Sequence, residues 1–287
     1  MNRIEEPKIK MVEYFNEHWY KINLLKPAEY FPSVTTKLGI VDKPFLARWR
    51  GDIGNREADM RLQEAQEKGS NIHNGWFVMT TGGAIIYQDR RHPQFTQEQI
   101  DHVFTEHIGN IAIIREQDEQ VDLWKLTQWH KLLNPEYLQH EIVLYSLTNK
   151  EAGTCDKVIS VKEGVYSING AKPLSLKGGV YVVDLKTGKQ VDDSSFMQIS
   201  AYREMMIEMG MYKREDFAGG LIVHTGASTK GGIKGLATVL RTSQELDQDY
   251  VDYRTASNLW MRKNKDKRPD VFEFPALLTL TDKKEAA

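Results

Sequence analysis

The feature that most constrains the fold is a series of strand-like and helix-like segments between residues 141 and 226. Three apolar segments with the length and β-branched content of strands are followed by an amphipathic helix and a fourth strand-like segment. The segments are EIVLYSL (141–147), TCDKVISV (154–161), VYVVDLK (180–186), DDSSFMQISAYREMMIEMG (192–210) and GGLIVHTG (219–226). An antiparallel run of three strands, joined through a crossover helix to a further strand, predicts an α/β sheet flanked by helices.

The remaining segments give weaker signals. Helical periodicity begins near Asn55 and places His73 late in a long helix or just past its end. One short strand is expected near residues 18–22, and a small hairpin after the second strand. We expect one domain over residues 1–287, made of an N-terminal extension (1–30), a helical insertion (85–136) and a core of strands and a helix that would carry catalysis (137–225).

Composition excludes several classes of protein. The chain has 287 residues, of which 40% are hydrophobic, and a formal net charge of −2, so it can bury a sizeable core while a basic groove stays compatible with the total charge. Its one cysteine, Cys155, excludes an intramolecular disulfide, a four-cysteine zinc site and a four-cysteine iron–sulfur cluster. The absence of an apolar stretch of membrane-spanning length and of a signal-peptide pattern predicts a protein that is neither membrane-bound nor secreted.

The third strand-like segment ends with two charges on one face. Side chains alternate along a strand, so Asp184 and Lys186 point the same way as Val182, while Leu185 points the other way. A solvated pair at a strand end, ahead of a Thr-Gly turn, is one explanation, and such a pair contributes less than about 1 kcal/mol. The other explanation is a functional pair, and that requires partners.

Two acidic residues on the neighbouring strands are candidates for those partners. Asp156 lies in the second strand, and Glu141 begins the first. Carboxylates that converge at strand ends cannot all stay ionised unless a cation joins them, and hard oxygen ligands suit Mg²⁺ or Mn²⁺. A lysine beside such a site can position or activate a water and offset the charge that develops on a phosphoryl group.

This set of motifs resembles the PD-(D/E)xK nuclease superfamily, and within it the RecB-like exonuclease branch that includes phage and mitochondrial genome maintenance exonucleases. The matching pieces are GSNIH (69–73), HE ending at Glu141, GTCD ending at Asp156, DLKTGK starting at Asp184 and QISAY (198–202), with PSVTT and LARWR near the start. The resemblance covers about residues 30–265. It implies a restriction-endonuclease-like core, a mixed central sheet flanked by helices, with helical insertions.

The resemblance also implies roles for individual residues. The expected metal ligands are His73, Asp156, Asp184 and the backbone carbonyl of Leu185, with Lys186 as the catalytic lysine. Glu141 would support the water of the metal or a second metal. Gln198 and Tyr202 would contact the DNA backbone or steady the lysine, and further DNA contacts are expected from Ser33, Thr35 and Thr187. The cysteines of the iron–sulfur members are absent, which excludes that subgroup.

Each of these residues also has a purely structural explanation. His73 could be a core histidine bonded to a carbonyl, Asp156 a turn carboxylate and Glu141 a solvated side chain at a strand start. Gln198 and Tyr202 could be packing residues whose polar ends are satisfied. These alternatives remain open at the level of sequence.

The function that the resemblance implies is a Mg²⁺- or Mn²⁺-dependent DNA exonuclease that prefers single-stranded DNA. An endonuclease of the same superfamily and a catalytically inactive DNA-binding module are the alternatives. The expected partners are single-stranded DNA or DNA ends, with other replication or recombination proteins as further candidates, for a monomer in the cytoplasm of a bacterial or phage-infected cell or in an organellar matrix. We expect residues 85–136 either to roof the site, with Trp124 and Trp129 able to stack on bases, or to pack on the sheet as an extra layer.

Overall fold

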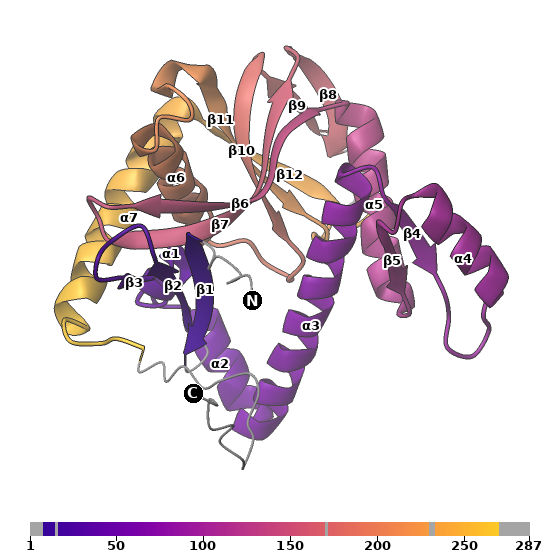
Figure 1. Cartoon of the computed structure of the whole chain (residues 1–287), viewed down its shortest axis with the longest axis horizontal. Helices are drawn as coiled ribbons and strands as arrows, with labels where there is room; N and C mark the ends of the chain where they lie inside the picture. The colour runs from indigo at the N-terminus through magenta and orange to yellow at the C-terminus, as the bar shows by residue number, and fades with distance from the viewer. Residues whose placement is uncertain (1–7, 15–16, 170–171, 230–232, 270–287) are drawn as a thin grey trace, which may run out of the picture.

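A five-stranded mixed sheet forms the centre of the molecule in the computed structural model (Figure 1). The strand order is β12-β11-β10-β7-β6. The strands are β6 (Glu136–Ser146), β7 (Glu151–Val161), β10 (Gly179–Lys186), β11 (Phe217–His224) and β12 (Ala237–Thr242). The structure describes residues 8–14, 17–169, 172–229 and 233–269.

The connections within the sheet match the expected α/β class. Strands β6, β7 and β10 form the antiparallel run, and helix α6 (Asp193–Glu208) crosses over to β11, which pairs parallel to β10. Asp192 is the N-cap of this helix, and the chain leaves it through Gly210 at φ 70°. The small hairpin is also present, as β8 (Gly164–Asn169) and β9 (Lys172–Leu176). The prediction of a mixed α/β sheet flanked by helices is therefore confirmed.

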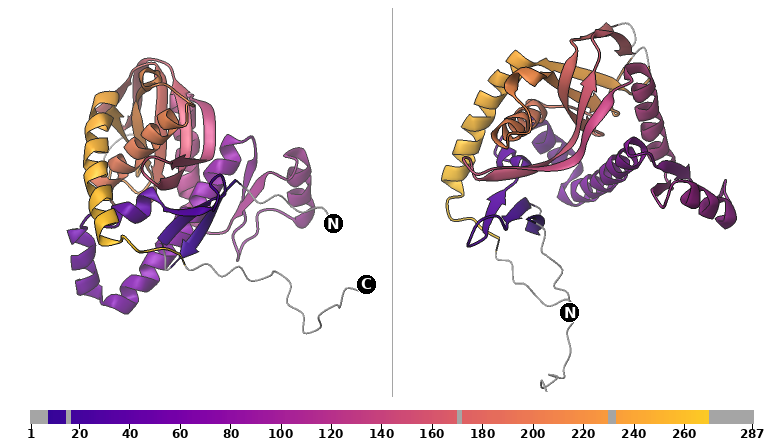
Figure 2. Two further views of the ribbon diagram at one scale, coloured as in Figure 1. Left: turned by 60° about the vertical axis from the view of Figure 1, so that its left-hand side comes forward. Right: turned by 45° about the horizontal axis from the view of Figure 1, so that its top comes forward.

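Each face of the sheet is covered by its own hydrophobic core. Tyr181, Val183 and Leu185 of β10 pack with buried side chains of α3 (Asn55–Thr80) and α5 (Gln117–Leu133). Val182 packs on the opposite face with α6 and α7 (Ser243–Lys263). The alternation expected along the third strand is thus observed, and Figure 2 shows the yellow helix α7 and the purple helix α3 on different sides of the sheet.

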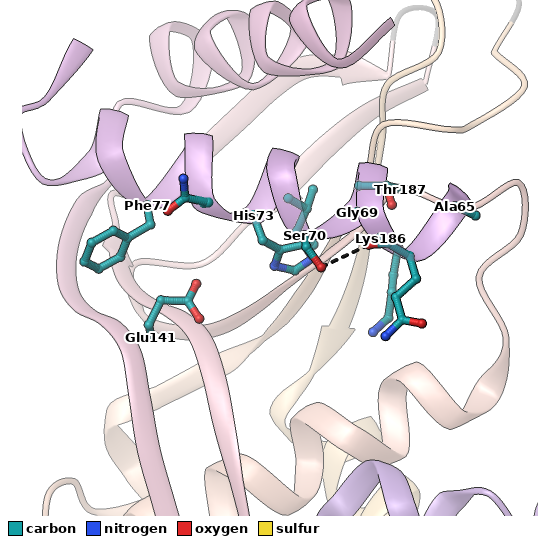
Figure 3. A pocket seen from close by; sticks show the side chains of 12 residues that line it. Ala65, Gly69, Ser70, His73, Phe77, Glu141, Lys186 and Thr187 are labelled. Carbon is teal, nitrogen blue, oxygen red and sulfur yellow. Dashed lines mark hydrogen bonds between the residues drawn. The ribbon is translucent and has the colours of Figure 1, made fainter. Parts of the chain in front are cut away.

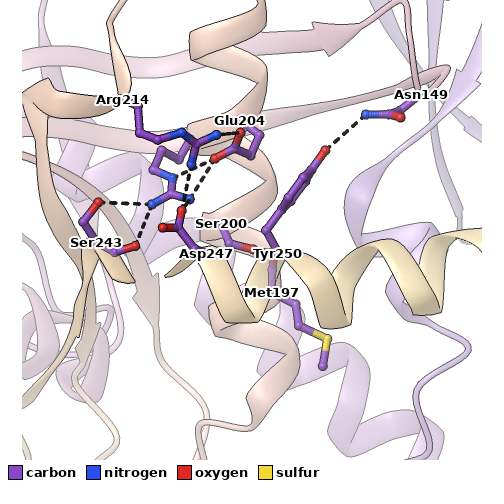
Figure 4. Close-up of polar contacts among 9 residues, drawn as sticks. Asn149, Met197, Ser200, Glu204, Arg214, Ser243, Asp247 and Tyr250 are labelled. Carbon is purple, nitrogen blue, oxygen red and sulfur yellow. Dashed lines mark hydrogen bonds and ion pairs between the residues drawn. The ribbon is translucent and has the colours of Figure 1, made fainter. Parts of the chain in front are cut away.

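A buried arginine fixes α6 against α7 (Figure 4). The guanidinium of Arg203 is fully buried and donates to the backbone oxygen of Ser243 at 2.9 Å and to Asp247 at 2.6 Å. Arg214 bridges Glu204 of α6 and Asp247 of α7. Charge-assisted hydrogen bonds thus hold the C-terminal half of α6 against the start of α7, and they fix the face that α6 presents to the sheet.

The N-terminal region contains more structure than the single strand we expected. Strands β1 (Ile9–Tyr14), β2 (Glu17–Ile22) and β3 (Glu29–Pro32) form a separate antiparallel sheet, ahead of the short helix α1 (Val34–Leu38). Tyr20 in β2 is hydrogen-bonded to Thr154 of β7 at 2.9 Å. Residues 17–30 are therefore packed on the central sheet, while residues 1–7 and 15–16 of the predicted extension lie outside the described part of the chain.

The predicted helical insertion is a mixed α/β unit instead. It contains a two-stranded parallel sheet as well as helices: β4 (Ala84–Tyr87), α4 (Gln97–Glu106), β5 (Ile111–Ile114) and α5. The sequences AIIY and IAII of its strands are rich in isoleucine, which favours extended backbone. Figure 1 shows α4, β4 and β5 on the outer side of α3 and α5, away from the central sheet.

A helical arm projects beside the sheet. It consists of α2 (Pro44–Ile53), which has no buried residue, and the first half of α3. The arm (residues 43–68) starts where Lys43 Nζ lies 3.0 Å from Asp192 Oδ2, just ahead of α6. It ends at Gly69, where an added Cβ would lie 3.3 Å from Thr187 Oγ1. In the described part of the chain, neither α3 nor any other helix combines the length and the apolar character that crossing a membrane requires.

Candidate metal centre

A cleft of about 680 Å³ opens where α3 passes the end of β10 (Figure 3). Its walls are α3 from Ala65 to Phe77, Glu141 of β6 and the segment Leu185–Gly188. Leu185 contributes its backbone, since its side chain is 1% exposed. Each of these segments contains part of a motif that carried the resemblance: GSNIH in α3, HE in β6 and DLKTGK at the end of β10.

Three side chains bring possible metal-binding atoms together in this cleft. One ligand atom each of His73, Glu141 and Asp156 lies within 4.8 Å of the other two. His73 reaches the group because α3 runs close to the end of β10, where the missing side chain of Gly69 leaves room for Thr187. A histidine with two carboxylates can hold a divalent ion.

Glu141 lies inside a strand, whereas we expected it at the start of one. Strand β6 begins at Glu136, and the pairs His140–Lys157 and Ile142–Cys155 put Glu141 opposite Asp156. The backbone of Glu141 has φ 42°, in the left-handed region that a glutamate adopts only at a cost of about 1 kcal/mol or more. This local distortion accompanies the approach of the Glu141 carboxylate to His73 and Asp156.

Asp156 is held as a carboxylate by its neighbours. Its Oδ2 accepts a hydrogen bond from the backbone N–H of Leu185 at 2.8 Å and lies 3.4 Å from His73 Nδ1. Burial raises the pKa of Asp156, but the charge of His73 and these hydrogen bonds outweigh burial and lower that pKa. Burial likewise lowers the pKa of His73, yet the carboxylates of Asp156, Asp184 and Glu141 raise it to about 9.

A second polar group links Asp184 to α6. Asp184 Oδ2 lies 2.8 Å from Lys186 Nζ, and Gln198 Oε1 accepts a hydrogen bond from the same ammonium at 3.0 Å. Gln198 Nε2 donates to Asp184 Oδ1 at 3.0 Å and to Tyr202 Oη at 3.2 Å. The ring of Tyr202 packs against β7 at Gly153, where an added Cβ would lie 2.5 Å from it. Gln198 and Tyr202 are buried, and their contacts position the lysine.

Burial and ion pairing have opposite effects on the pKa values of Asp184 and Lys186. Burial and the nearby Asp156 raise the pKa of Asp184 to about 6, against the opposing effect of Lys186. Burial disfavours the charged lysine, but Asp184 outweighs it and raises the pKa of Lys186. Two buried carboxylate oxygens, Glu141 Oε1 and Asp184 Oδ2, accept no hydrogen bond within the described part of the chain. Such atoms are costly unless a cation or water meets them.

The predicted ligand set and the observed cluster overlap in part. His73 and Asp156 belong to both, and Glu141 takes part directly in the cluster. Asp184 faces Lys186 and Gln198. Leu185 supplies an N–H to Asp156, a contact that we did not predict.

The other predicted contact residues lie in different places. Thr187 lines the cleft, but Ser33 is buried as the N-cap of α1 and accepts the N–H of Thr36, with exposed Thr35 beside it. Trp129 is fully buried and donates to Thr238, so its expected role in base stacking is wrong; Trp124 is 55% exposed. The cleft walls come from α3, β6 and the end of β10, so the expected roof formed by residues 85–136 is not what borders the site.

One residue at the centre escaped the sequence-based prediction. Lys157, directly after Asp156, is fully buried, and its Nζ lies 3.5 Å from Glu141 Oε1. The sequence did contain a signal for the burial of this lysine. Lys157 lies in the strand segment CDKVISV, whose apolar residues occupy both faces and predict burial on both sides.

Comparison with known proteins does not identify the chain. No protein-family model matches it, and no curated protein matches it either.

Proposed function

We propose that the protein is a Mg²⁺- or Mn²⁺-dependent deoxyribonuclease with a restriction-endonuclease-like core, acting as an exonuclease that hydrolyses phosphodiester bonds from DNA ends and prefers single strands. The observation that carries the proposal is that one open cleft is lined by His73 and Glu141 of the metal-capable cluster and by Lys186 of the carboxylate–lysine pair, with Asp156 and Asp184 buried behind them. The mixed sheet with its crossover helix supports the fold assignment.

The residues at the cleft fit a divalent ion. His73, Glu141 and Asp156 would hold it, with Asp184 and the carbonyl of Leu185 as the further ligands that the resemblance implies. The buried oxygens Glu141 Oε1 and Asp184 Oδ2 each face one ammonium, of Lys157 and Lys186, and lack further partners in the described part of the chain. When bound, such an ion supplies Lewis acidity, which polarises a phosphoryl oxygen and lowers the pKa of a coordinated water.

Lys186 is placed to act on the phosphate and on the attacking water. Its ammonium is fixed by Asp184 and Gln198, while its side chain keeps 28% of its surface exposed at the cleft. Because its pKa is raised, Lys186 stays protonated at neutral pH. It therefore serves better to orient water through a donated hydrogen bond and to stabilise negative charge than to remove a proton.

The position of the arm favours a substrate with a free end. Its first residue, Lys43, pairs with Asp192 in the loop before α6, and its far end joins Gly69, which lines the cleft. Its outer helix is unburied and carries Phe45 at 57% exposure, with Arg48 exposed nearby. Aromatic rings and cationic side chains are what single-stranded DNA-binding surfaces use. We infer that the arm, rather than residues 85–136, encloses the strand.

Digestion of end-labelled DNA tests the proposal. Linear single-stranded DNA should be degraded with Mg²⁺ or Mn²⁺, survive in excess EDTA and survive with Ca²⁺, whose larger shell misplaces the attacking water. Covalently closed single-stranded circles should survive all conditions. Circles and linear strands cut at equal rates would favour the endonuclease alternative, and full cleavage in EDTA would exclude the metal mechanism.

A pair of lysine variants locates the activity. Lys186→Met should lose cleavage by about 10²-fold or more while keeping Mn²⁺ binding, since it removes a transition-state contact and no metal ligand. Lys125→Met is the matched control, because Lys125 also pairs with an aspartate, Asp122 at 2.6 Å, but lies outside the cleft walls. Equal loss in both variants would remove Lys186 from the mechanism.

A further inference from the structure

The buried Lys157 sits in a cage of two aromatic rings. Its ammonium lies 4.9 Å from the ring centroid of Trp76 and 5.4 Å from that of Phe77. Both rings follow His73 by about one turn of α3, so the same helical segment supplies a metal-cluster residue and the cage. An ammonium over aromatic faces is attracted to them as a cation. Burial lowers the pKa of Lys157, and the aromatic rings and the carboxylate of Glu141 oppose that effect.

The charged partner of Lys157 is Glu141. The distance from Nζ to Oε1 is 3.5 Å, and neither atom makes a hydrogen bond to the described residues. A buried ion pair without supporting hydrogen bonds adds little to stability, because desolvation offsets the attraction. Glu141 also occupies a strained backbone conformation at this point. Both features are unfavourable for folding, which points to a role at the site.

Lys157 faces the cluster from its buried side. Its ammonium lies beside Oε1 of Glu141, whose side chain also lines the cleft and belongs to the metal-capable cluster. Cys155 and Val158, its neighbours along β7, are fully buried, and Lys157 itself is 0% exposed. The side chain is thus enclosed by two aromatic rings and apolar neighbours, and it directs its ammonium at Glu141.

We propose that Lys157 is a built-in cation of this centre, which balances Glu141 and limits the cluster to one divalent ion. With His73 neutral, as a metal ligand must be, the site has three carboxylates (Glu141, Asp156 and Asp184) and two ammonium groups (Lys157 and Lys186), a net charge of −1. One divalent ion brings this to +1, and a second would bring it to +3 in a poorly solvated space. Lys157 acts through Glu141 and is a positioning residue. The inference rests on the proposed function only in requiring that the cluster bind metal.

Calorimetric titration of the metal-free protein with Mn²⁺, without DNA, tests the inference. The wild-type chain should bind one ion. Lys157→Met keeps the length of the side chain but removes its charge, so the site with one ion is neutral and should accept a second at millimolar Mn²⁺. Two ions in the wild type, or one ion in Lys157→Met, would overturn the inference and leave the proposed function intact. No binding by the wild type would overturn both.

A double variant distinguishes the loss of the Lys157–Glu141 ion pair from a general folding defect. Lys157→Met should lower the urea midpoint of the metal-free protein, and adding Glu141→Gln should restore it, because both charges of the pair are then gone. Lys37→Met is the matched control, because Lys37 is also fully buried beside a glutamate but is not among the residues that line the cleft. This substitution should leave the number of bound Mn²⁺ ions at one. No restoration in the double variant would show that Lys157 does not serve Glu141.

Discussion

Two lysine–glutamate pairs, each with one member on β7, differ in how completely their polar atoms are hydrogen-bonded. Lys37 Nζ lies 2.7 Å from Glu151 Oε2 and donates to the backbone oxygen of Asn149 at 3.1 Å. The same glutamate oxygen accepts the hydroxyl of Tyr253 at 2.7 Å. The other pair, Lys157 and Glu141, is separated by 3.5 Å and neither of the facing atoms has a hydrogen bond among the described residues.

The difference separates a structural pair from a functional one. Glu151 and its partners join α1, β7 and α7, so the saturated pair holds layers together. The unsaturated pair borders the cleft, next to His73 and Asp156. Groups whose hydrogen bonds are complete within the fold have nothing left for a ligand, whereas incomplete groups mark places where an ion or substrate can bind.

The largest expected effect comes from Asp184→Asn. Cleavage should fall by about 10³-fold or more, because the variant removes a charged group of the centre. The free energy of unfolding of the metal-free protein should stay equal or rise, since burial already disfavours the charged carboxylate (its pKa is raised to about 6) and asparagine keeps the acceptor for Gln198. Parallel cleavage assays and urea denaturation check both points. A wild-type cleavage rate would remove Asp184 from the site.

The next effect concerns the structural pair. Lys37→Met should lower the free energy of unfolding by about 3–5 kcal/mol, because it leaves the Glu151 carboxylate buried without its counter-ion. Lys157→Met should lower it by less, because Glu141 keeps 35% of its side chain exposed and can be hydrated. Urea denaturation in EDTA compares the two. A larger loss for Lys157→Met than for Lys37→Met would contradict the comparison.

A glycine behind the cleft should have a moderate effect. Gly153→Ala would put a Cβ 2.5 Å from the Tyr202 ring, so the ring must move, at a cost of about 1–3 kcal/mol. The displacement should also lower kcat, since Tyr202 is hydrogen-bonded to Gln198, which holds Lys186. Gly51→Ala on α2 is the stability control, because nothing lies within 4 Å of its added Cβ. Unchanged stability and kcat in Gly153→Ala would argue against this support.

The smallest effect is a pH dependence of the metal-free protein. The folded-state pKa of His73 is about 9, above its ordinary value of 6.5, so its ion pair with Asp156 stabilises fully below pH 6.5 and is lost as pH rises through 9. The loss should be on the order of 1 kcal/mol, since the side chain is 32% exposed and partly screened. Urea denaturation in EDTA at both pH values should show it. The same slope in His73→Gln would assign the effect to other groups.

The sheet and much of the site were predictable from sequence because their signals are local. A continuous run of apolar, mostly β-branched residues marked β10, and an N-cap followed by helical periodicity marked α6. The N-terminal sheet was largely missed because its strands are short and mostly half-exposed, which gives little apolar alternation. Strands β4 and β5 were missed because four-residue apolar runs between helices do not distinguish strand from helix.

The features of the site that were missed depend on contacts distant in sequence. No local sequence pattern predicts the left-handed backbone of Glu141 on β6, which lies opposite Asp156 on the neighbouring strand β7. The burial of Lys157 requires the rings of Trp76 and Phe77, which come from α3. Long-range packing of this kind determines which charged residues lose contact with water, and a sequence motif does not contain it.

Anomalous scattering from a wild-type crystal soaked in Mn²⁺ would locate the ion most directly. We expect a single peak between His73, Glu141 and Asp156 and none near Glu151. At saturating Mn²⁺, a map without a peak in this cluster would show that the unsatisfied pair does not belong to a metal centre.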